Sequence, residues 1–461
     1  MKKEMKQHYV HLEERYLEDF IINSIVDELE DKSELKREVA YNKFRFDAVL
    51  MNGLPNVQRI PKKEIFLEIK CANNFNYIKP ILEKYRNNID GYICIISYVD
   101  EEIYGDNYAI LGYSYIEQLA ERHPLRWWNY LASIDSGAQV IISDDGKYAT
   151  MVGDILGGRG IEPVIKSDDI FKLSDINFND YKSKIKTFKK YPAIILGNGT
   201  SIPFGSDPWS KVIDTLFDYL NPLYIDNLSM VKKAIGDSNY FAASMSKLTI
   251  SSSKYNEALK SCIYRKYEKR MHTSDTLIRS VVNAKTKYRD MPLLTYNYDT
   301  FLEDDYNLVN SLKMNAVYNE KSDKMTIEPK IRHVHGFCKN TKTATPKNIV
   351  LTDEEYFNEY KNGKSWVVSV QKDALENFLC LYVGSSMSDL FQMSIINDVK
   401  KEKSKKSNQN GVWYCYALMC LKDLSHKDIL TINNYYLQKS VKLIFVKDYS
   451  DLATKLDDLF K

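Results

Sequence analysis

The sequence predicts an α/β protein with two domains, the second of them built on a doubly wound parallel sheet. Three observations favour this class. Near-continuous apolar runs recur along the chain, as expected for strands that are buried on both faces. Helical segments separate these runs, which is the order of β-α-β units. The length of 461 residues is about three times that of a typical ~150-residue domain, so more than one domain is expected.

Composition excludes several protein classes. Hydrophobic residues make up 44% of the chain and aromatic residues 12%, which is enough to build a core and excludes intrinsic disorder. The 64 Lys and Arg residues nearly balance the 62 Asp and Glu residues, so no overall field draws the chain to nucleic acid. No apolar run reaches the ~18 residues of a membrane span, and the opening segment lacks the apolar stretch of a secretory signal. We therefore expect a cytoplasmic protein.

The seven cysteines indicate structural thiols. No two of them form a CxxC pair, and a zinc ribbon needs two such pairs. Most lie inside apolar runs, where a free cysteine packs as a small hydrophobic residue. We expect neither a disulfide scaffold nor zinc.

The first domain is predicted to span residues 1–185 and to be a smaller α/β unit. An opening helix is indicated by apolar residues at steps of three and four, namely Leu12, Tyr16, Phe20, Ile21 and Ile25. Short β-rich runs follow at 44–51, 64–71, 91–99, 108–114 and 138–144. Residues 115–132 favour a helix that Pro124 interrupts or restarts. The polar, basic stretch 180–191 marks the boundary to the second domain.

The second domain is predicted to span residues 186–461. Its apolar runs lie at 193–197, 292–296, 378–384, 413–419 and 441–446. The stretch 207–290 has no strand pattern and favours a helical insertion packed on the sheet. The charged run 400–411 is typical of a solvated loop. Sheets of this kind bind ligands at the carboxyl ends of their strands, so the residues that follow each strand are the candidates for a site.

A glycine-rich turn follows the first predicted strand of this domain. Gly197 and Gly199 let the backbone turn tightly and approach a phosphate closely. Ser201 adds a hydroxyl for the same ligand, and the start of a following helix favours negative charge. The turn alone is equally typical of an ordinary connection, so the other strand ends decide between the two interpretations.

Polar side chains also follow three other predicted strands. They are Asn297 and Asp299 after 292–296, His335 before Gly336 in RHVHGF, and Gly384, Ser385, Ser386 and Asp389 after 378–384. Asn297 and Asp299 share a face if the chain is extended there. In a parallel sheet all these segments converge on one edge, so we expect a single site. His333 is a rival of His335, but no glycine follows it.

The ordered set of motifs resembles the sirtuin family. The family pattern is Gly-Ala-Gly-x-Ser, Thr-Gln-Asn-Ile-Asp, His-Gly and Gly-Thr-Ser. In the same order this chain has GNGTS at 197–201, TYNYD at 295–299, HG at 335–336 and GSS at 384–386. Ile202-Pro203-Phe204 is also similar to the stretch that follows the first motif. The resemblance covers about 190–460 and implies a Rossmann-like domain that binds NAD.

Departures from the family pattern imply a chemistry other than protein deacylation. The four-cysteine zinc module of deacetylating sirtuins is absent, because Cys338 stands alone after the His-Gly. Tyr296 replaces the family glutamine, and Asn198 replaces the alanine of the glycine turn. This pattern, with TDEEYFNEY at 352–360, resembles the sirtuin-like domains of bacterial antiphage systems, which degrade NAD.

This resemblance implies a role for each motif residue. Asn297 would place water or the ribose, Asp299 would hold the carboxamide or the local loop, and His335 would act as a base near the ribose hydroxyls. The residues that would bind NAD are Gly197, Asn198, Gly199, Ser201, Thr295, Gly384, Ser385 and Ser386. Cleavage of the ribose–nicotinamide bond passes through a positively charged ribose, and a histidine of ordinary pKa suits a base at neutral pH.

The first domain carries a fainter signal for metal chemistry. Glu68 and Lys70 are two residues apart in a predicted strand and share a face, and Asp47 stands in the strand before it. Asp47 and Glu68 are the expected ligands of one Mg²⁺ ion, with Lys70 orienting the attacking water. Acids in the preceding helix are Glu14, Glu18 and Glu28.

This pattern resembles the PD-(D/E)xK restriction-endonuclease-like superfamily, although Phe46 replaces the proline of that motif. The resemblance implies a nuclease fold for the first domain. The alternative is a surface Glu–Lys pair on a degenerate nuclease-like module that serves recognition or assembly.

Three functions stay open at this point. The first is an antiphage effector that hydrolyses NAD to nicotinamide and ADP-ribose, linear or cyclic, with an N-terminal domain that senses, scaffolds or binds nucleic acid. The family implies a trigger and assembly, as a homo-oligomer or with a partner defence protein or phage component, and no membrane. The second is a Mg²⁺-dependent DNA nuclease whose sirtuin-like half is a nucleotide-binding regulator. The third is a non-catalytic module for an ADP-ribose-type ligand.

Overall fold

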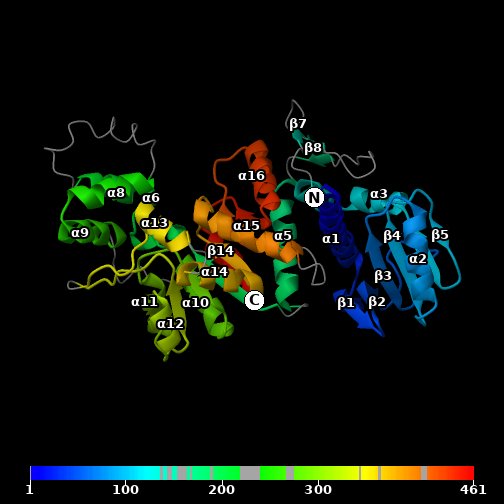
Figure 1. The fold of residues 1–461 in the computed structure, drawn as a ribbon, viewed down its shortest axis with the longest axis horizontal. Coiled ribbons are helices and arrows are strands. Elements are labelled where there is room, and N and C mark those ends of the chain that lie inside the picture. Colours follow the sequence, from blue (N-terminus) through cyan, green and yellow to red (C-terminus); the bar gives the residue numbers. More distant parts are fainter. Residues whose placement is uncertain are drawn as a thin grey trace. The chain divides into compact units, whose positions relative to one another are not determined.

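The computed structural model describes most of the chain (Figure 1). The described residues are 2–134, 139–142, 148–152, 164–166, 169–186, 190–218, 239–265, 275–341, 344–361, 365–405 and 413–461. The chain divides into two compact units. Unit 1 comprises Met1–Asp180, Lys400–Tyr414 and Leu424–Lys442, and unit 2 comprises Tyr181–Val399, Cys415–Asp423 and Leu443–Lys461. Two segments of the predicted second domain thus group with unit 1, and the roles given to domains 1–185 and 186–461 stay predictions.

A six-stranded sheet forms the centre of unit 1, in the order β1-β2-β3-β4-β6-β5. Its strands are β1 (Leu35–Tyr41), β2 (Phe44–Leu50), β3 (Ile65–Lys70), β4 (Tyr92–Ser97), β5 (Ile103–Tyr104) and β6 (Tyr108–Leu111). β1, β2 and β3 are antiparallel neighbours, whereas β3, β4 and β6 are parallel. The helix α1 (Lys2–Glu28) precedes the sheet and packs against β3, and α2 (Phe75–Arg86) connects β3 to β4 (Figure 1).

The other elements of unit 1 are helices and a small second sheet. They are α3 (Tyr113–Arg122), α4 (Pro124–Ile134), β7 (Gln139–Ile142), β8 (Tyr148–Val152), β9 (Val164–Lys166) and α16 (His426–Gln438). The helix α5 (Lys172–Lys186) begins in unit 1 and ends in unit 2. Trp128 on α4 is fully buried and donates to Asn434 Oδ1 on α16 over 3.1 Å.

The predictions for the first domain are confirmed in outline. Each of the five β-rich runs contains a strand, although residues 138 and 143–144 of the last run lie outside the described residues. Pro124 begins a new helix, where its missing N–H costs no hydrogen bond. The strand β1 has no counterpart in the prediction because only Leu35 of its seven residues is buried, so it lacks an apolar run. The predicted boundary stretch is helical up to Lys186.

Unit 2 is built on a seven-stranded sheet in the order β12-β13-β11-β10-β14-β15-β16. Its strands are β10 (Pro192–Leu196), β11 (Leu293–Thr295), β12 (Asn315–Val317), β13 (Lys330–His333), β14 (Leu379–Val383), β15 (Cys415–Cys420) and β16 (Val441–Val446). The pairings from β12 to β15 are all parallel, as predicted for this domain. All residues of β10, β11 and β14 are buried, which accounts for their continuous apolar sequence.

Helices cover this sheet and form the segment before β11. They are α6 (Trp209–Asp218), α8 (Asn239–Thr249), α9 (Ser252–Ile263), α10 (Leu277–Lys287), α11 (Phe301–Val309), α12 (Glu320–Met325), α13 (Asp353–Tyr360), α14 (Trp366–Asn377), α15 (Leu390–Lys405) and α17 (Asp451–Phe460). The described parts of 207–290 contain helices and no strand, as predicted. The prediction of a loop at 400–411 is wrong for 400–405, which continue α15, and 406–411 lie outside the described residues.

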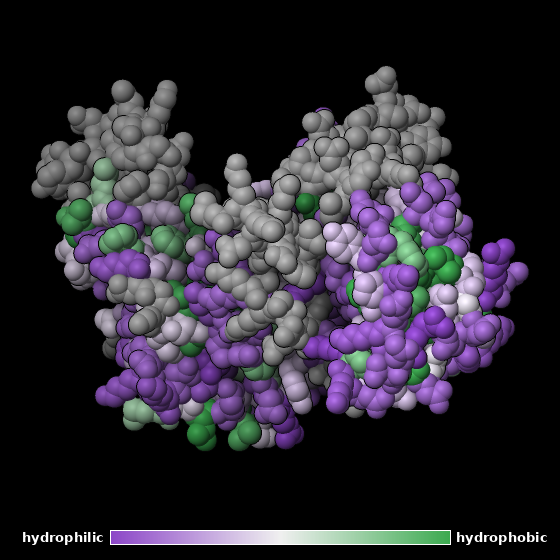
Figure 2. Space-filling model, turned by 45° about the vertical axis from the view of Figure 1, so that its right-hand side comes forward, coloured by the Kyte–Doolittle hydropathy of each residue, from purple (hydrophilic) through white to green (hydrophobic). Residues whose placement is uncertain are grey.

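The surface shown in Figure 2 is mainly hydrophilic, with hydrophobic side chains in small separate groups. The apolar strands are instead buried in the interior of each unit. Among the helices of the described residues, none combines the length and the apolar character needed to cross a membrane.

Candidate functional site

A cavity of about 660 Å³ opens in unit 2 where β10, β11, β13 and β14 end. Since these strands are parallel neighbours, their carboxyl ends meet at one edge of the sheet. The predicted site residues that line the cavity are Gly197, Asn198, Gly199, His335, Gly384, Ser385 and Ser386. The volume lies within the range of small-molecule and cofactor sites. All four motifs therefore reach the cavity, the second of them through Tyr296 alone.

The two glycine-containing turns interlock at the floor of this cavity. Gly197 donates to the Val383 carbonyl over 2.9 Å, and Gly199 donates to the Gly384 carbonyl over 2.8 Å. A Cβ atom on Gly197 would lie only 2.6 Å from Ser385 Cα. Gly384 has a φ of +65°, a left-handed conformation that glycine adopts without strain. The glycines thus allow one backbone to pack directly on another.

Asn297 lies behind the glycine turn, and it is not among the residues that line the cavity. Its Nδ2 is 3.0 Å from the Gly197 carbonyl and from Thr200 Oγ1, and 2.8 Å from Ser201 Oγ. Its Oδ1 is buried and has no hydrogen-bond partner within the described part of the chain. Asn297 therefore fixes the turn that forms the cavity floor.

Asp299 and Thr295 lie in the same buried layer. Asp299 accepts from the Phe301 amide over 3.0 Å at the start of α11, and Thr295 Oγ1 accepts from the Asn297 amide over 3.0 Å. Burial raises the pKa of Asp299 to about 6, against the opposing hydrogen bond from Ser201. These side chains, like Ser201, do not line the cavity.

The rival histidine, His333, is also held beneath the cavity. Its Nε2 lies 2.8 Å from Glu303 Oε1, and its Nδ1 lies 3.1 Å from the Asn297 carbonyl. Burial lowers the pKa of this imidazole, but the Glu303 carboxylate outweighs that effect, and the pKa is raised. His333 contacts no cavity surface, and His335 does.

His335 is 2% exposed and lies in a cage of tyrosines. Its Nε2 is 3.1 Å from the Tyr360 hydroxyl, its Nδ1 is 3.3 Å from the Tyr356 hydroxyl, and the Tyr296 ring packs edge-on against it. Burial lowers the pKa of His335 to about 4, although the nearby Asp389 carboxylate acts in the opposite direction. The prediction of an ordinary pKa is wrong for this reason, and the imidazole is neutral at pH 7.

The tyrosines of α13 are site residues that the motif reasoning missed. Tyr356 and Tyr360 are four residues apart and so share one face of the helix. The Tyr356 hydroxyl donates to Asp389 Oδ2 over 3.1 Å, and Phe391 stacks on both tyrosine rings. Helical spacing in the segment 352–360 was the signal in the sequence that marks this pair.

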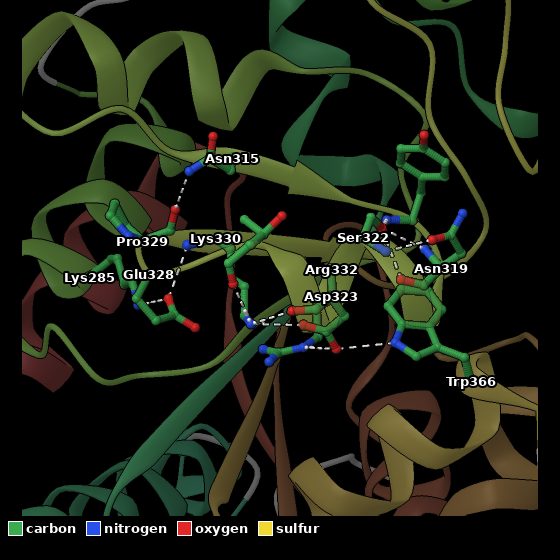
Figure 3. Close-up of polar contacts among 12 residues, drawn as sticks. Lys285, Asn315, Asn319, Ser322, Asp323, Glu328, Pro329, Lys330, Arg332 and Trp366 are labelled. Carbon is green, nitrogen blue, oxygen red and sulfur yellow. Dashed lines mark hydrogen bonds and ion pairs between the residues drawn. The ribbon is translucent and has the colours of Figure 1, made fainter.

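An ion-pair cluster fixes the strand that leads to the histidines (Figure 3). Asp323 pairs with Lys330 over 2.9 Å and with Arg332 over 3.0 Å, both on β13. It also accepts from Trp366 Nε1 over 3.1 Å at the start of α14. Burial alone would raise the pKa of Asp323, but these donors lower it. The same helix carries Gln371, which accepts from the Tyr296 hydroxyl, so the cluster links β13 to the wall of the cavity.

In unit 1 the predicted acids and Lys70 come together on β2, β3 and α1. Lys70 Nζ lies 3.0 Å from Glu68 Oε1 and 2.9 Å from Glu14 Oε1. Asp47 Oδ2 accepts from the Ile69 amide over 2.7 Å. The three predicted residues are thus neighbours, as the two-residue spacing and the β2–β3 pairing require.

Several buried carboxyl groups lie close together in this cluster, and their pKa values are raised. Burial and the Glu68 carboxylate raise the pKa of Asp47 to about 7, and burial also raises the pKa of Glu68. Glu68 Oε2 is buried and makes no hydrogen bond of ordinary geometry within the described part of the chain, although the Tyr85 hydroxyl lies near the carboxylate. Such an acceptor suits a cation. No group of three or more His, Cys, Asp and Glu among the described residues is arranged as a metal site.

The remaining acids of α1 differ in position. Burial raises the pKa of Glu18 strongly, and Asp47 adds to the effect, so Glu18 lies near the cluster. Glu28 instead pairs with Arg122 over 2.8 Å and with His123 over 2.9 Å. Although burial acts in the opposite direction, these contacts lower the pKa of Glu28 to about 2. Glu28 therefore belongs to a separate ion pair.

Comparison with known families now adds to this geometry. Residues 292–438 match the family model of the SIR2-like domain. The match confirms the sirtuin-like resemblance for this part of the chain and indicates an NAD-related, nucleotide-binding fold. It covers less than half of the chain, includes Asn297, His335 and the turn at 384–386, and leaves out the glycine turn and most of unit 1. No curated protein matches the chain.

Proposed function

We propose that this chain hydrolyses NAD to nicotinamide and ADP-ribose in the cavity of unit 2. One observation carries the proposal. His335, the interlocked glycine turns and the serines at 385–386 line the same cavity, although they lie far apart in the sequence. The SIR2-like match over 292–438 supports NAD as the ligand.

The proposed reaction breaks the bond between the ribose carbon and the nicotinamide nitrogen. Water adds to that carbon and releases one proton, so the products are ADP-ribose, nicotinamide and H⁺. Positive charge develops on the ribose as the bond lengthens, as in glycoside hydrolysis. Nicotinamide needs no proton to leave, since its ring nitrogen is already cationic in NAD.

The residues of the cavity suit this chemistry. The neutral His335 would accept a hydrogen bond from a ribose hydroxyl or from the attacking water once that group displaces the Tyr360 hydroxyl from Nε2. The glycine turn at 197–201 would let the backbone approach the diphosphate closely, with Asn297 and Asp299 supporting that turn from behind. Ser385 and Ser386 would line the adenosine side.

The resemblance to antiphage proteins supports a biological role as an effector that depletes NAD during infection. In this proposal a trigger activates the enzyme, which works as a homo-oligomer or with a partner defence protein or phage component. Unit 1 then senses, scaffolds or binds nucleic acid.

The test is to incubate the purified full-length protein with NAD, alone and with lysates of phage-infected cells, and to measure nicotinamide by chromatography. We expect release that is lost in His335→Ala and retained in Lys70→Ala. Calorimetry with ADP-ribose separates the third candidate, because a non-catalytic module would bind this ligand without any release of nicotinamide. Release that survives His335→Ala would remove the assignment of this residue.

A second candidate function rests on the acids of unit 1. The unpaired Glu68 Oε2 beside Asp47 favours a cation, and these two residues would hold Mg²⁺, with Lys70 orienting water. When bound, Mg²⁺ would polarise a phosphate group of DNA. The resemblance to restriction endonucleases supports this candidate, in which unit 2 binds a nucleotide as a regulator. Mg²⁺-dependent DNA cleavage that disappears in Lys70→Ala would establish it.

A further inference from the structure

A continuous series of hydrogen bonds passes through His335. On one side the Tyr296 hydroxyl donates to Gln371 Oε1, and Gln371 Nε2 donates to the Tyr360 oxygen over 3.4 Å. Tyr360 then meets His335 Nε2. On the other side His335 Nδ1 meets the Tyr356 hydroxyl, which reaches Asp389 Oδ2. The series begins and ends at side chains that line the cavity, Tyr296 and Asp389.

The donors and acceptors of this series fix the direction of each bond. The Tyr356 hydroxyl has a single proton and donates it to Asp389 Oδ2. Tyr240 also neighbours this hydroxyl, but its neutral oxygen is a weaker acceptor than a carboxylate. The Tyr356 oxygen is then left to accept, and the proton of the neutral imidazole must lie on Nδ1 of His335. Its Nε2 accepts from Tyr360.

We infer that Tyr356 and Asp389 are positioning residues that hold His335 as the Nδ1-protonated tautomer. This inference rests on the proposed function, because it gives the tautomer a role at the same site. In this tautomer Nε2 carries no proton, so it can accept a proton or a hydrogen bond. In the other tautomer Nε2 carries the proton and can only donate. Neither residue belongs to the four motifs of the sirtuin pattern at 197–201, 295–299, 335–336 and 384–386.

The anchoring of Asp389 makes the inference sharply testable. Its Oδ1 accepts from the Phe391 amide over 2.8 Å and from the Gln392 amide over 3.0 Å, at the start of α15. In Asp389→Asn the remaining carbonyl oxygen keeps these two bonds, so the new NH₂ group takes the place of Oδ2. It donates to the Tyr356 oxygen, whose proton then turns to His335 Nδ1. The substitution therefore reverses the tautomer without removing the helix start.

The first experiment reads the tautomer directly, on the full-length protein labelled with ¹⁵N-histidine. Long-range ¹H–¹⁵N spectra distinguish a protonated from an unprotonated ring nitrogen, and His335→Gln identifies the signal among the seven histidines. We expect Nδ1–H in the wild type, Nε2–H in Asp389→Asn and a mixture in Tyr356→Phe. Asp398→Asn and Tyr191→Phe, at exposed side chains, are the matched controls that keep the wild-type tautomer. An Nε2–H signal in the wild type overturns the inference.

The second experiment measures NAD hydrolysis by the same proteins. We expect kcat to fall about 10- to 100-fold in Asp389→Asn and Tyr356→Phe, with KM changed less than about twofold, because the contacts that bind the dinucleotide stay in place. Unchanged kcat in both variants overturns the positioning role while the proposed function stands. A wild type that releases no nicotinamide under any condition removes the proposed function, and the tautomer spectra still decide whether Asp389 and Tyr356 control His335.

Discussion

The amide of Gly199 donates to the carbonyl oxygen of Gly384 over 2.8 Å, and a Cβ atom on Gly199 would lie 2.8 Å from that same oxygen. Two turns that are separated by most of unit 2 therefore touch backbone to backbone. The floor of the cavity depends on this contact, because both turns line it.

The first prediction concerns this contact. Gly199→Ala places a methyl group against backbone atoms that cannot rotate away, so one turn must shift. We expect unit 2 to lose about 1–3 kcal/mol of stability and NAD binding to weaken. Scanning calorimetry and NAD titration check both. Stability and NAD binding equal to those of the wild type would contradict the prediction, because they would show that the turns at Gly199 and Gly384 can move apart without loss.

The second prediction concerns Asn297. In Asn297→Ala the Gly197 carbonyl and the hydroxyls of Thr200 and Ser201 lose their shared donor inside the protein. We expect a loss of about 1–3 kcal/mol in the stability of unit 2. Asn377→Ala is the exposed control, since its side-chain amide donates to the exposed Asp373, and it should change stability by less than about 0.5 kcal/mol. Equal effects of the two substitutions would contradict the role of Asn297.

The third prediction is a pH dependence from His335. Burial lowers the folded-state pKa to about 4, from an ordinary value of 6.5. The folded state therefore resists protonation, and stability is present above pH 6.5 and is lost as the pH falls towards 4. The loss is on the order of 3 kcal/mol for a shift of this size. Calorimetry at pH 7.5 and pH 4.5 should show a smaller decrease for His335→Gln than for the wild type.

The fourth prediction concerns the acids of unit 1. In Lys70→Met the Glu68 and Glu14 carboxylates lose their common cation, and we expect unit 1 to lose about 2–4 kcal/mol. Adding Glu68→Gln should restore part of this stability, because it removes one of the unpaired charges. Lys79→Met, whose exposed side chain pairs only loosely with Glu83, is the control and should have little effect. A Lys70→Met protein as stable as the wild type would contradict this prediction, because it would show that water solvates the Glu14 and Glu68 carboxylates well.

The parallel sheet of unit 2 was predictable because its strands are buried on both faces. The runs at 193–197 and 378–384 are apolar throughout, the run at 441–446 is apolar except for Lys442, and each forms a strand. The strand β12 carries no such signal, since two of its three residues, Asn315 and Ala316, are not buried. Short strands at a sheet edge depend on backbone pairing more than on side-chain burial, so a pattern of apolar residues does not reveal them.

The candidate site was predictable in part. Glycines and serines after strands, with His335 before a glycine, identified residues that the structure brings to one cavity. The sequence does not show which polar side chain faces the cavity and which packs inside the protein, and Asn297 is one that packs inside. It also does not show that burial among tyrosines lowers the pKa of His335, because the sequence alone does not place Tyr356 and Tyr360 of α13 against the imidazole.

The chain passes from one unit to the other repeatedly after residue 399. The segments Lys400–Tyr414 and Leu424–Lys442 belong to unit 1, while the strand residues between them belong to unit 2. A single cut near residue 185 therefore cannot yield two intact halves. A fragment that begins there would keep α16 but lose α4, the helix it packs against, and would expose apolar side chains such as Ile429 and Leu437. Excised halves of this protein should aggregate, and activity assays belong on the undivided polypeptide.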